Sequence, residues 1–201
     1  GTGDLAIVAD SDYISLSNGT NDYTGVTDVR KGHLKLEADG VLGHTSLLKL
    51  SGNTQVSLFG NFTNQQGVAQ TVGAVQSTQN SLLNLGNQGK LTIQGQLANG
   101  GAQNSIIEGY IAGNTGAQLI FNGAHNTVLA QNLGLKAQID INGATTVQTD
   151  DAQSLGISGD VNLANNAILL LGNHDLNNTI FNKTLHGRGD VIITESLLNG
   201  Q

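Results

Sequence analysis

The chain has 201 residues and a formal net charge of −7, with 11% charged residues and no Pro, Cys, Met or Trp. The acidic balance argues against nucleic acid or an anionic membrane as a partner. No apolar run of about 18 residues is present, so we expect no direct insertion of this segment into a membrane. Disordered chains are enriched in Pro, Glu and Lys, whereas this chain is rich in Gly and carries regular aliphatic pairs, which argues against disorder.

The missing residue types also constrain the fold and the compartment. Proline has no N–H for a β-ladder and suits only edges and bulges, so its absence favours a sheet with few edge strands. A compositional bias of the source is the alternative explanation. The absence of Cys fits either a reducing compartment or an exported protein that avoids disulfides.

Short strands are predicted along the whole chain, each from two apolar residues separated by one residue, the pattern of a strand with one buried face. In chain order these pairs are Leu34/Leu36, Val56/Leu58, Leu83/Leu85, Leu91/Ile93, Leu119/Phe121, Ile139/Ile141, Val161/Leu163, Leu169/Leu171 and Val191/Ile193. Turns are expected at Asn-Gly pairs such as Asn18-Gly19, Asn122-Gly123 and Asn142-Gly143, because both residue types tolerate positive φ. No window sustains helical spacing over three turns.

The pairs return at a nearly constant interval. Leu34 precedes Val56 by 22 residues, Leu119 precedes Ile139 by 20, and Leu169 precedes Val191 by 22. Such a period indicates a solenoid, and the consensus of leucine-rich repeats is not sustained here. We therefore predict one all-β domain over 1–201, a parallel β-helix with about 20–22 residues per coil and roughly nine coils. The longer interval between Leu91 and Leu119 predicts an inserted loop near Asn99–Asn104.

The segment Asn21–Leu36 (NDYTGVTDVRKGHLKL) resembles the repeat of autotransporter passengers of the self-associating adhesin class. The pattern Asn-x-Tyr-Thr-Gly-x-Thr-x-Val-x-x-Gly-x-Leu-x-Leu matches throughout. Gly40–Leu50 and Gln70–Val75 are similar to its continuation, so the resemblance covers 21–75. Leu185–Thr194 is similar to a strand of later coils.

The resemblance implies a right-handed, three-sided β-helix that is one segment of a longer passenger. It also implies export through an outer-membrane barrel, a location at the Gram-negative cell surface or in the medium, and a role in adhesion, autoaggregation or biofilm formation. The implied partner is a second copy of the protein, or a host surface protein or glycan. No signal peptide is visible at Gly1, and neither it nor the barrel is expected within this chain.

No catalytic, cofactor-binding or metal-binding residues are assigned. Pectin-cleaving enzymes share the β-helix but need clustered carboxylates, and the period cannot align Asp140 with Asp150 and Asp151 on one face. Arg30 and Arg188, the two arginines, lie far apart in sequence. The five histidines, His33, His44, His125, His174 and His186, lack metal-site spacing. Asp10 and Asp12 are the alternative as calcium ligands, although the glycine-rich calcium repeat is missing.

Two candidate recognition elements remain. Asn61, Thr63, Asn64 and Gln65 form a polar loop that could take part in self-association or adhesion, although Asn and Thr also suit β-helix turns. Arg188-Gly189-Asp190 is the tripeptide that integrins recognise, but a turn that opens a strand explains it equally. We expect an adhesive or self-associating segment. The alternatives are a passive stalk or folding nucleus that presents a distal domain and, less favoured, a polysaccharide-acting enzyme.

Overall fold

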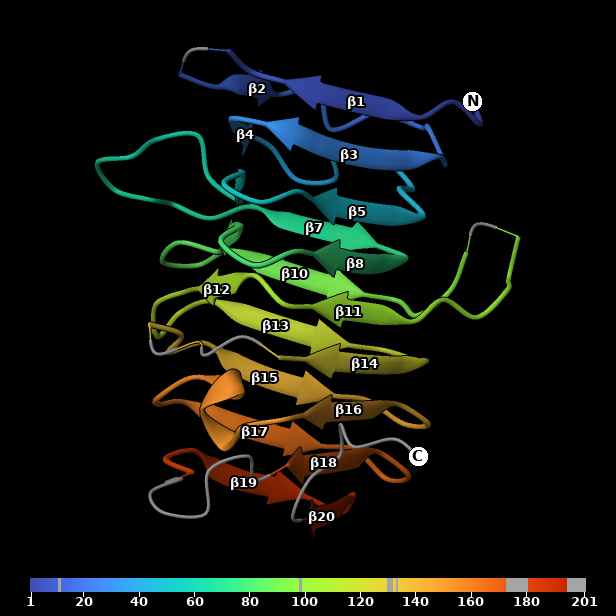
Figure 1. Ribbon diagram of the computed structural model, residues 1–201, viewed down its shortest axis with the longest axis vertical. Coiled ribbons are helices and arrows are strands. Elements are labelled where there is room, and N and C mark those ends of the chain that lie inside the picture. The colour runs from blue at the N-terminus through green and yellow to red at the C-terminus, as the bar shows by residue number, and fades with distance from the viewer. Residues whose placement is uncertain (11, 98, 130–131, 133, 173–180, 195–201) are drawn as a thin grey trace.

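The computed structural model describes residues 1–10, 12–97, 99–129, 132, 134–172 and 181–194. In these residues the chain winds into a parallel β-helix whose strands stack along one axis (Figure 1). The predicted fold class is thereby confirmed. Three sheets, called A, B and C, form the sides, and each coil runs from a strand of sheet A through side B to side C.

Sheet A extends along the whole rod and is its longest element. Its nine strands are β1 (Leu5–Val8), β3 (Val26–Lys31), β5 (Leu47–Leu50), β8 (Ala74–Ser77), β11 (Ser105–Ile107), β14 (His125–Val128), β16 (Thr146–Thr149), β18 (Ile168–Gly172) and β20 (Asp190–Thr194). Each strand but the last begins a coil, which defines coils 1 to 8.

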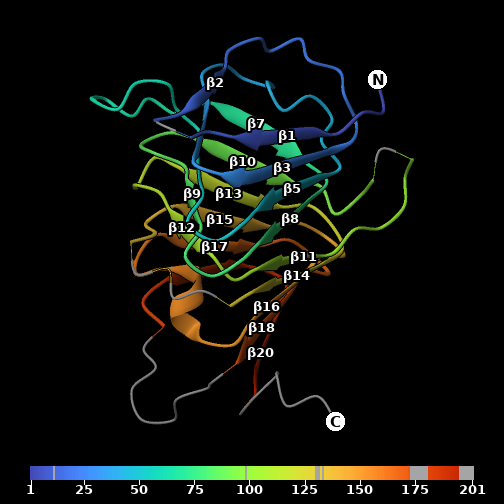
Figure 2. The same cartoon turned by 45° about the horizontal axis from the view of Figure 1, so that its top comes forward.

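The other two sheets each occupy part of the rod. Sheet B belongs to coils 1–5 and contains β2 (Ile14–Leu16), β4 (His33–Leu36), β6 (Gln55–Ser57), β9 (Leu82–Asn84) and β12 (Tyr110–Ala112). Sheet C belongs to coils 3–8 and contains β7 (Ala69–Val72), β10 (Lys90–Ile93), β13 (Gln118–Phe121), β15 (Gln138–Ile141), β17 (Asp160–Leu163) and β19 (Thr184–Gly187). The 3₁₀ helix η1 (Ala152–Leu155) lies below β12 on side B (Figures 1 and 2).

The predicted register is confirmed strand by strand. Leu34 pairs with Val56, Leu119 with Ile139, and Leu169 with Val191. Leu91 pairs with Leu119, and the extra residues between them form a loop closed by an antiparallel bridge from Gln96 to Ala102. The predicted insertion is therefore present, a few residues earlier than expected.

Apolar side chains of all three sheets fill the interior. Leu34, Leu91 and Ile139 are fully buried, as the alternating pattern predicts. The prediction is wrong for the last rung, where Val191 and Ile193 are 39% and 74% exposed. No described strand pairs with the far side of β20, so none of the described coils packs beneath these two side chains.

The turns differ from the expectation for Asn-Gly pairs. Positive φ falls on the residue after the pair, at Ala124 (57°) and Ala144 (55°), and not on the glycines. Asn166 (67°) takes the same conformation 22 residues after Ala144. The corner geometry is thus fixed by its place in the coil and imposed even on alanine, which is strained there.

The residues of Asn21–Leu36 that carry the family resemblance have structural roles here. Asn21 Nδ2 donates a hydrogen bond to the Val41 carbonyl of the next coil (2.7 Å). The hydroxyl of Thr27 lies 3.0 Å from that of Tyr23 and 2.7 Å from that of Thr45. Gly32 has φ +79°, and a Cβ there would lie 2.4 Å from the Ala9 carbonyl oxygen. The motif thus secures the close stacking of coils.

Below coil 5, buried polar side chains bridge coils on side B and at its corner with sheet C. Asn132 accepts a hydrogen bond from the Ile111 N–H above it and donates one to the Ser154 carbonyl below it, both at 2.5 Å. Lys183 Nζ donates to the carbonyls of Ala137 (3.1 Å) and Ser158 (2.5 Å). These two side chains connect successive coils, as the backbone ladder of sheet B does above them.

Candidate adhesive surface

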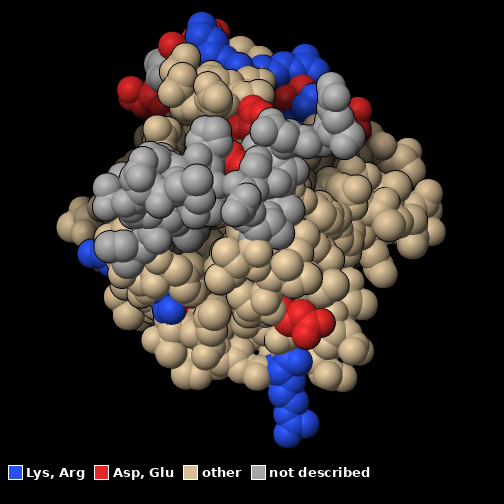
Figure 3. All heavy atoms as spheres, turned by 60° about the horizontal axis from the view of Figure 1, so that its bottom comes forward, with Lys and Arg blue, Asp and Glu red and all other residues tan. Residues whose placement is uncertain are grey.

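The middle of the rod is almost free of charge. Between Lys49 and Lys136 the sequence contains two charged residues, Lys90 and Glu108, and this stretch (residues 50–135), the neutral middle section, runs from β6 to β14. In Figure 3, which brings the C-terminal end of the rod forward, tan atoms, which are neither acidic nor basic, also cover most of the described surface. Such a surface can be brought against another molecule without desolvating many charges, which is costly.

The polar loop, residues 58–68 between β6 and β7, projects from the rod in the neutral middle section (Figure 1). It contains the four predicted residues: Asn61, Thr63 and Asn64 are exposed, and Gln65 is half-buried. Asn61 Oδ1 accepts a hydrogen bond from the Thr63 N–H (2.8 Å). The Asn64 carbonyl accepts one from Asn87 Nδ2 of the next coil (2.5 Å). The loop is thus fixed to the rod while its polar side chains face outward.

A cluster of aromatic rings around a buried lysine clamps this loop onto sheet B. The Lys35 side chain is 6% exposed, and its Nζ lies 3.9 Å from the ring centroid of Tyr13 and 4.8 Å from that of Phe62 in the polar loop. Its charge is balanced by Glu37, whose Oε1 lies 3.5 Å from Nζ. Cation–π contacts of a desolvated ammonium contribute about 2 kcal/mol or more.

Two further rings support Phe62. Phe59 meets it edge to face with centroids 5.8 Å apart, and the His33 ring lies 5.5 Å away. Burial, with the nearby Lys35 charge adding to it, holds the pKa of His33 below its usual value of 6.5. The imidazole is therefore neutral at pH 7, and the cluster carries no net charge.

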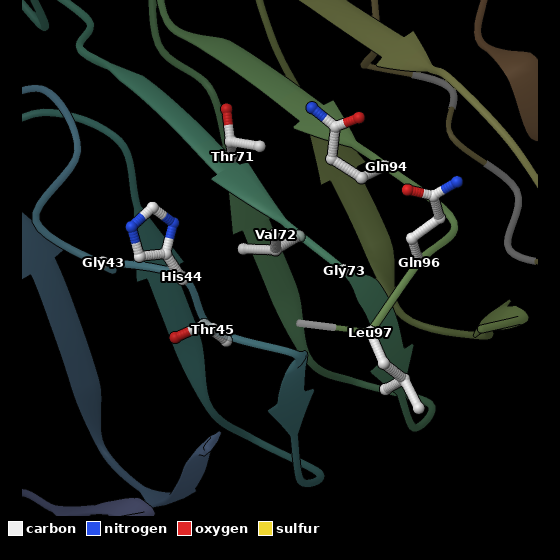
Figure 4. Close-up of a pocket in the computed structure, with 9 residues that line it drawn as sticks. All are labelled: Gly43, His44, Thr45, Thr71, Val72, Gly73, Gln94, Gln96 and Leu97. Atoms are coloured by element: carbon white, nitrogen blue, oxygen red, sulfur yellow. The ribbon is translucent and has the colours of Figure 1, made fainter. Parts of the chain in front are cut away.

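A shallow groove of about 170 Å³ lies beside the inserted loop, at the border of the neutral middle section (Figure 4). The side chains of His44, Thr71, Gln94 and Gln96 border it. No carboxylate is among its lining residues. The groove offers hydrogen-bonding groups for a polar ligand but no acid–base pair.

The integrin-type tripeptide lies at the corner between β19 and β20. The Arg188 N–H donates to the Leu163 carbonyl (3.0 Å) and the Asp190 N–H to the Ala167 carbonyl (2.9 Å) of the coil above. The side chains of Arg188 and Asp190 are exposed, and Gly189 is half-buried. The tripeptide is thus part of a paired corner that opens β20, not the tip of a free loop.

The carboxylates considered for catalysis do not converge. Asp140 lies on the outer face of sheet C, where it accepts hydrogen bonds from Gln138 and Asn162. Asp150 follows β16 of sheet A, and Asp151 caps η1 through the Gln153 N–H. These three carboxylates therefore lie on two sides of the rod and do not form a common site.

The candidate metal ligands have other contacts. Asp10 pairs with Lys31 (2.5 Å), a hydrogen bond and charge that lower the pKa of its carboxyl. His125 bonds Gln148 (2.9 Å), His186 lies 3.7 Å from Asp160, and His174 lies outside the described residues. In the described ranges, no three His, Asp or Glu side chains are grouped so as to hold a metal ion.

The described part of the chain has no helix long and apolar enough to cross a membrane.

The sequence signals for the aromatic cluster were weak, because Tyr13, Lys35 and Phe62 come from three coils. The composition gave one signal. Aromatic residues make up only 3% of the chain, so each of them is a candidate for a specific role.

The comparisons with known proteins give relatives but no activity. No family model and no solved structure matches the chain. The uncharacterised lipoprotein YdeK of Escherichia coli K12 is 34% identical over 185 residues, which cover 91% of this chain and 12% of YdeK. The uncharacterised protein YuaQ of the same strain is 39% identical over 94 residues, 46% of this chain and 6% of YuaQ. The chain is thus similar to small parts of two much longer proteins.

Proposed function

We propose that the chain is a segment of a cell-surface β-helical rod of the autotransporter-passenger kind, which mediates adhesion, autoaggregation or biofilm formation through its polar outer faces. The observation that carries this proposal is the neutral middle section, with its fixed and projecting polar loop. Each hydrogen bond between rods contributes only about 0.5–1.5 kcal/mol net. Many such bonds in register add up along a repetitive surface, as in multivalent binding.

The location at the cell surface is part of the same proposal. One relative, YdeK, is described as a lipoprotein, which supports a place in the cell envelope. The acidic, proline-free composition of a rigid rod suits display outside the cell. More specifically, we propose that the protein is displayed at the outer membrane or released into the medium.

The test is to display the chain on a non-aggregating bacterium and to follow cell settling. We expect settling with the native chain and its loss with Thr71→Glu/Gln94→Glu, because both exposed positions lie in the neutral middle section. The matched control, Thr184→Glu/His186→Glu, makes the same charge change at exposed positions of β19. Equal settling of the two variants would refute the assignment of the surface.

A passive stalk is the second candidate. The observation in its favour is that Asn21, Thr27 and Gly32 of the motif serve the stacking of coils. A chain that stays monomeric, and whose cells neither settle nor adhere to host cells, would favour this function. A polysaccharide-acting enzyme has less support, because Asp140 lies on sheet C, apart from Asp150, which follows β16 of sheet A.

A further inference from the structure

The exposed aromatic side chains gather on one face. Of the seven Tyr and Phe residues, three are about half exposed: Tyr13 (49%), Phe62 (47%) and Tyr110 (51%). Tyr110 belongs to β12 of sheet B, Tyr13 immediately precedes β2, and Phe62 packs over β4. All three therefore lie along the outer face of sheet B.

The register orders this face as a row parallel to the rod axis. Tyr110 pairs with Leu82, Leu82 with Gln55, and Gln55 with His33. Tyr13 continues the row, because the next residue, Ile14, pairs with Leu34. Four steps of about 4.8 Å place the two tyrosines roughly 19 Å apart.

Unused hydrogen-bonding groups lie between the rings. Gln55 Nε2 donates to Ser57 Oγ (2.9 Å), and Asn84 Oδ1 accepts from the Gly86 N–H (3.0 Å). Among the described residues, Gln55 Oε1 and Asn84 Nδ2 have no hydrogen-bond partner. An acceptor and a donor therefore remain available on the same face as the rings.

We propose that this face, residues Tyr13, Phe62 and Tyr110 with Gln55 and Asn84, binds an uncharged oligosaccharide laid along the rod. The inference rests on the proposed adhesive function and adds the ligand class. Pyranose rings present C–H faces that stack on aromatic rings, and hydroxyl groups that both donate and accept hydrogen bonds.

The charges of the face select a neutral ligand. Lys35 is paired with Glu37 and enclosed by Tyr13 and Phe62, so it offers no free cation to a polyanion. A protein partner typically covers about 800 Å² with an apolar centre, whereas here the polar side chains of Gln55 and Asn84 lie, beside Leu82, between the Tyr13–Phe62 ring pair and Tyr110. A neutral sugar chain, which alternates apolar faces and hydroxyls, fits this pattern.

The test is isothermal titration of the whole chain with cellohexaose, chitohexaose and maltohexaose, and with a heparin hexasaccharide as the polyanion. We expect at least one neutral sugar to bind and heparin not to bind. Tyr13→Ala and Tyr110→Ala should each weaken binding by about tenfold or more, as at a recognition hot spot. Tyr110→Phe should retain binding because it keeps the ring.

Ile106→Ala is the matched control, since Ile106 is 48% exposed on the outer face of sheet A. Binding of none of the neutral sugars, binding of heparin alone, or unchanged affinity in Tyr110→Ala would overturn the inference. If cells settle but no sugar binds, this inference fails and the proposed function stands. If a sugar binds through Tyr110 but cells neither settle nor adhere, the proposed function fails and this inference stands.

Discussion

Coils 1–5 and coils 6–8 close the same side of the rod by different means. In coils 1–5 the strands of sheet B hydrogen-bond to one another through their backbones. In coils 6–8 the Asn132 side chain bonds to the coils above and below it, and Lys183, at the corner with sheet C, bonds to the two coils above it. On this side, the regular strands of coils 1–5 align outward-facing residues in columns, which suits recognition. In coils 6–8, a few buried polar groups hold the coils together there.

The largest expected effect tests how tightly the interior of the lower coils is packed. Ile139 of β15 is fully buried, so Ile139→Ala should lower the free energy of unfolding by about 2–5 kcal/mol. Ile193→Ala removes the same atoms from a side chain that is 74% exposed and should cost less than about 1 kcal/mol. Denaturant titration measures both, and a small loss for Ile139→Ala would indicate a loose lower half.

An effect of comparable size is expected at Asn132. Asn132→Leu leaves the Ile111 N–H and the Ser154 carbonyl without this partner, at about 1–3 kcal/mol for each buried group. Asn114 makes a side-chain bond to Asn87 at an exposed corner, so Asn114→Leu should change stability by about 0.5 kcal/mol or less. Similar losses in the two variants would show that Asn132 does not replace the ladder of sheet B.

Lys183 makes the stability of the folded chain depend on pH in the alkaline range. Burial lowers the pKa of Lys183 to about 8, although Asp160 opposes the shift. Between about pH 8 and its unfolded pKa of about 10.4, the unfolded chain holds the proton and the folded chain releases it. This group therefore makes stability rise with pH across that window. Melting temperatures from pH 7 to 10 should show a rise that Lys183→Met lacks, and equal profiles would contradict the assignment.

The smallest effect concerns corner strain. Ala144 has φ +55°, a conformation that costs a non-glycine residue roughly 1–2 kcal/mol. Glycine in its place loses about 0.4–1 kcal/mol through the greater freedom of the unfolded chain. Ala144→Gly should therefore raise stability slightly, by up to about 1 kcal/mol. A lower melting temperature would mean that the Ala144 methyl group contributes packing that outweighs the strain.

The sequence predicted the parts of this molecule that repeat. The pairing of Leu34 with Val56 and of Ile139 with Val161 follows from the period alone, because stacked strands must keep one register. Positive φ at Ala144 was missed because the corner's place in the coil outweighed the preference of the local residues. The exposure of Ile193 was missed because burial depends on what packs beneath a strand.

The candidate surfaces were predicted only in part. Asn61, Thr63 and Asn64 were expected to form an exposed polar loop, and they do. The clamp of that loop by Lys35 and Tyr13 depends on contacts between residues of three coils. Phe62 lies in the polar loop, outside the strand repeat that holds Lys35, so no spacing rule could place the two together.

Crosslinking between copies tests the central claim most directly. The chain has no cysteine, so a single introduced thiol reports one position. Cells displaying Gln94→Cys, in the neutral middle section, or Thr184→Cys, on β19, would be settled and treated with a thiol-to-thiol bismaleimide. The adhesive-rod account predicts crosslinked dimers for Gln94→Cys well above those for Thr184→Cys. Equal yields at the two positions, or dimers from Thr184→Cys alone, would contradict it.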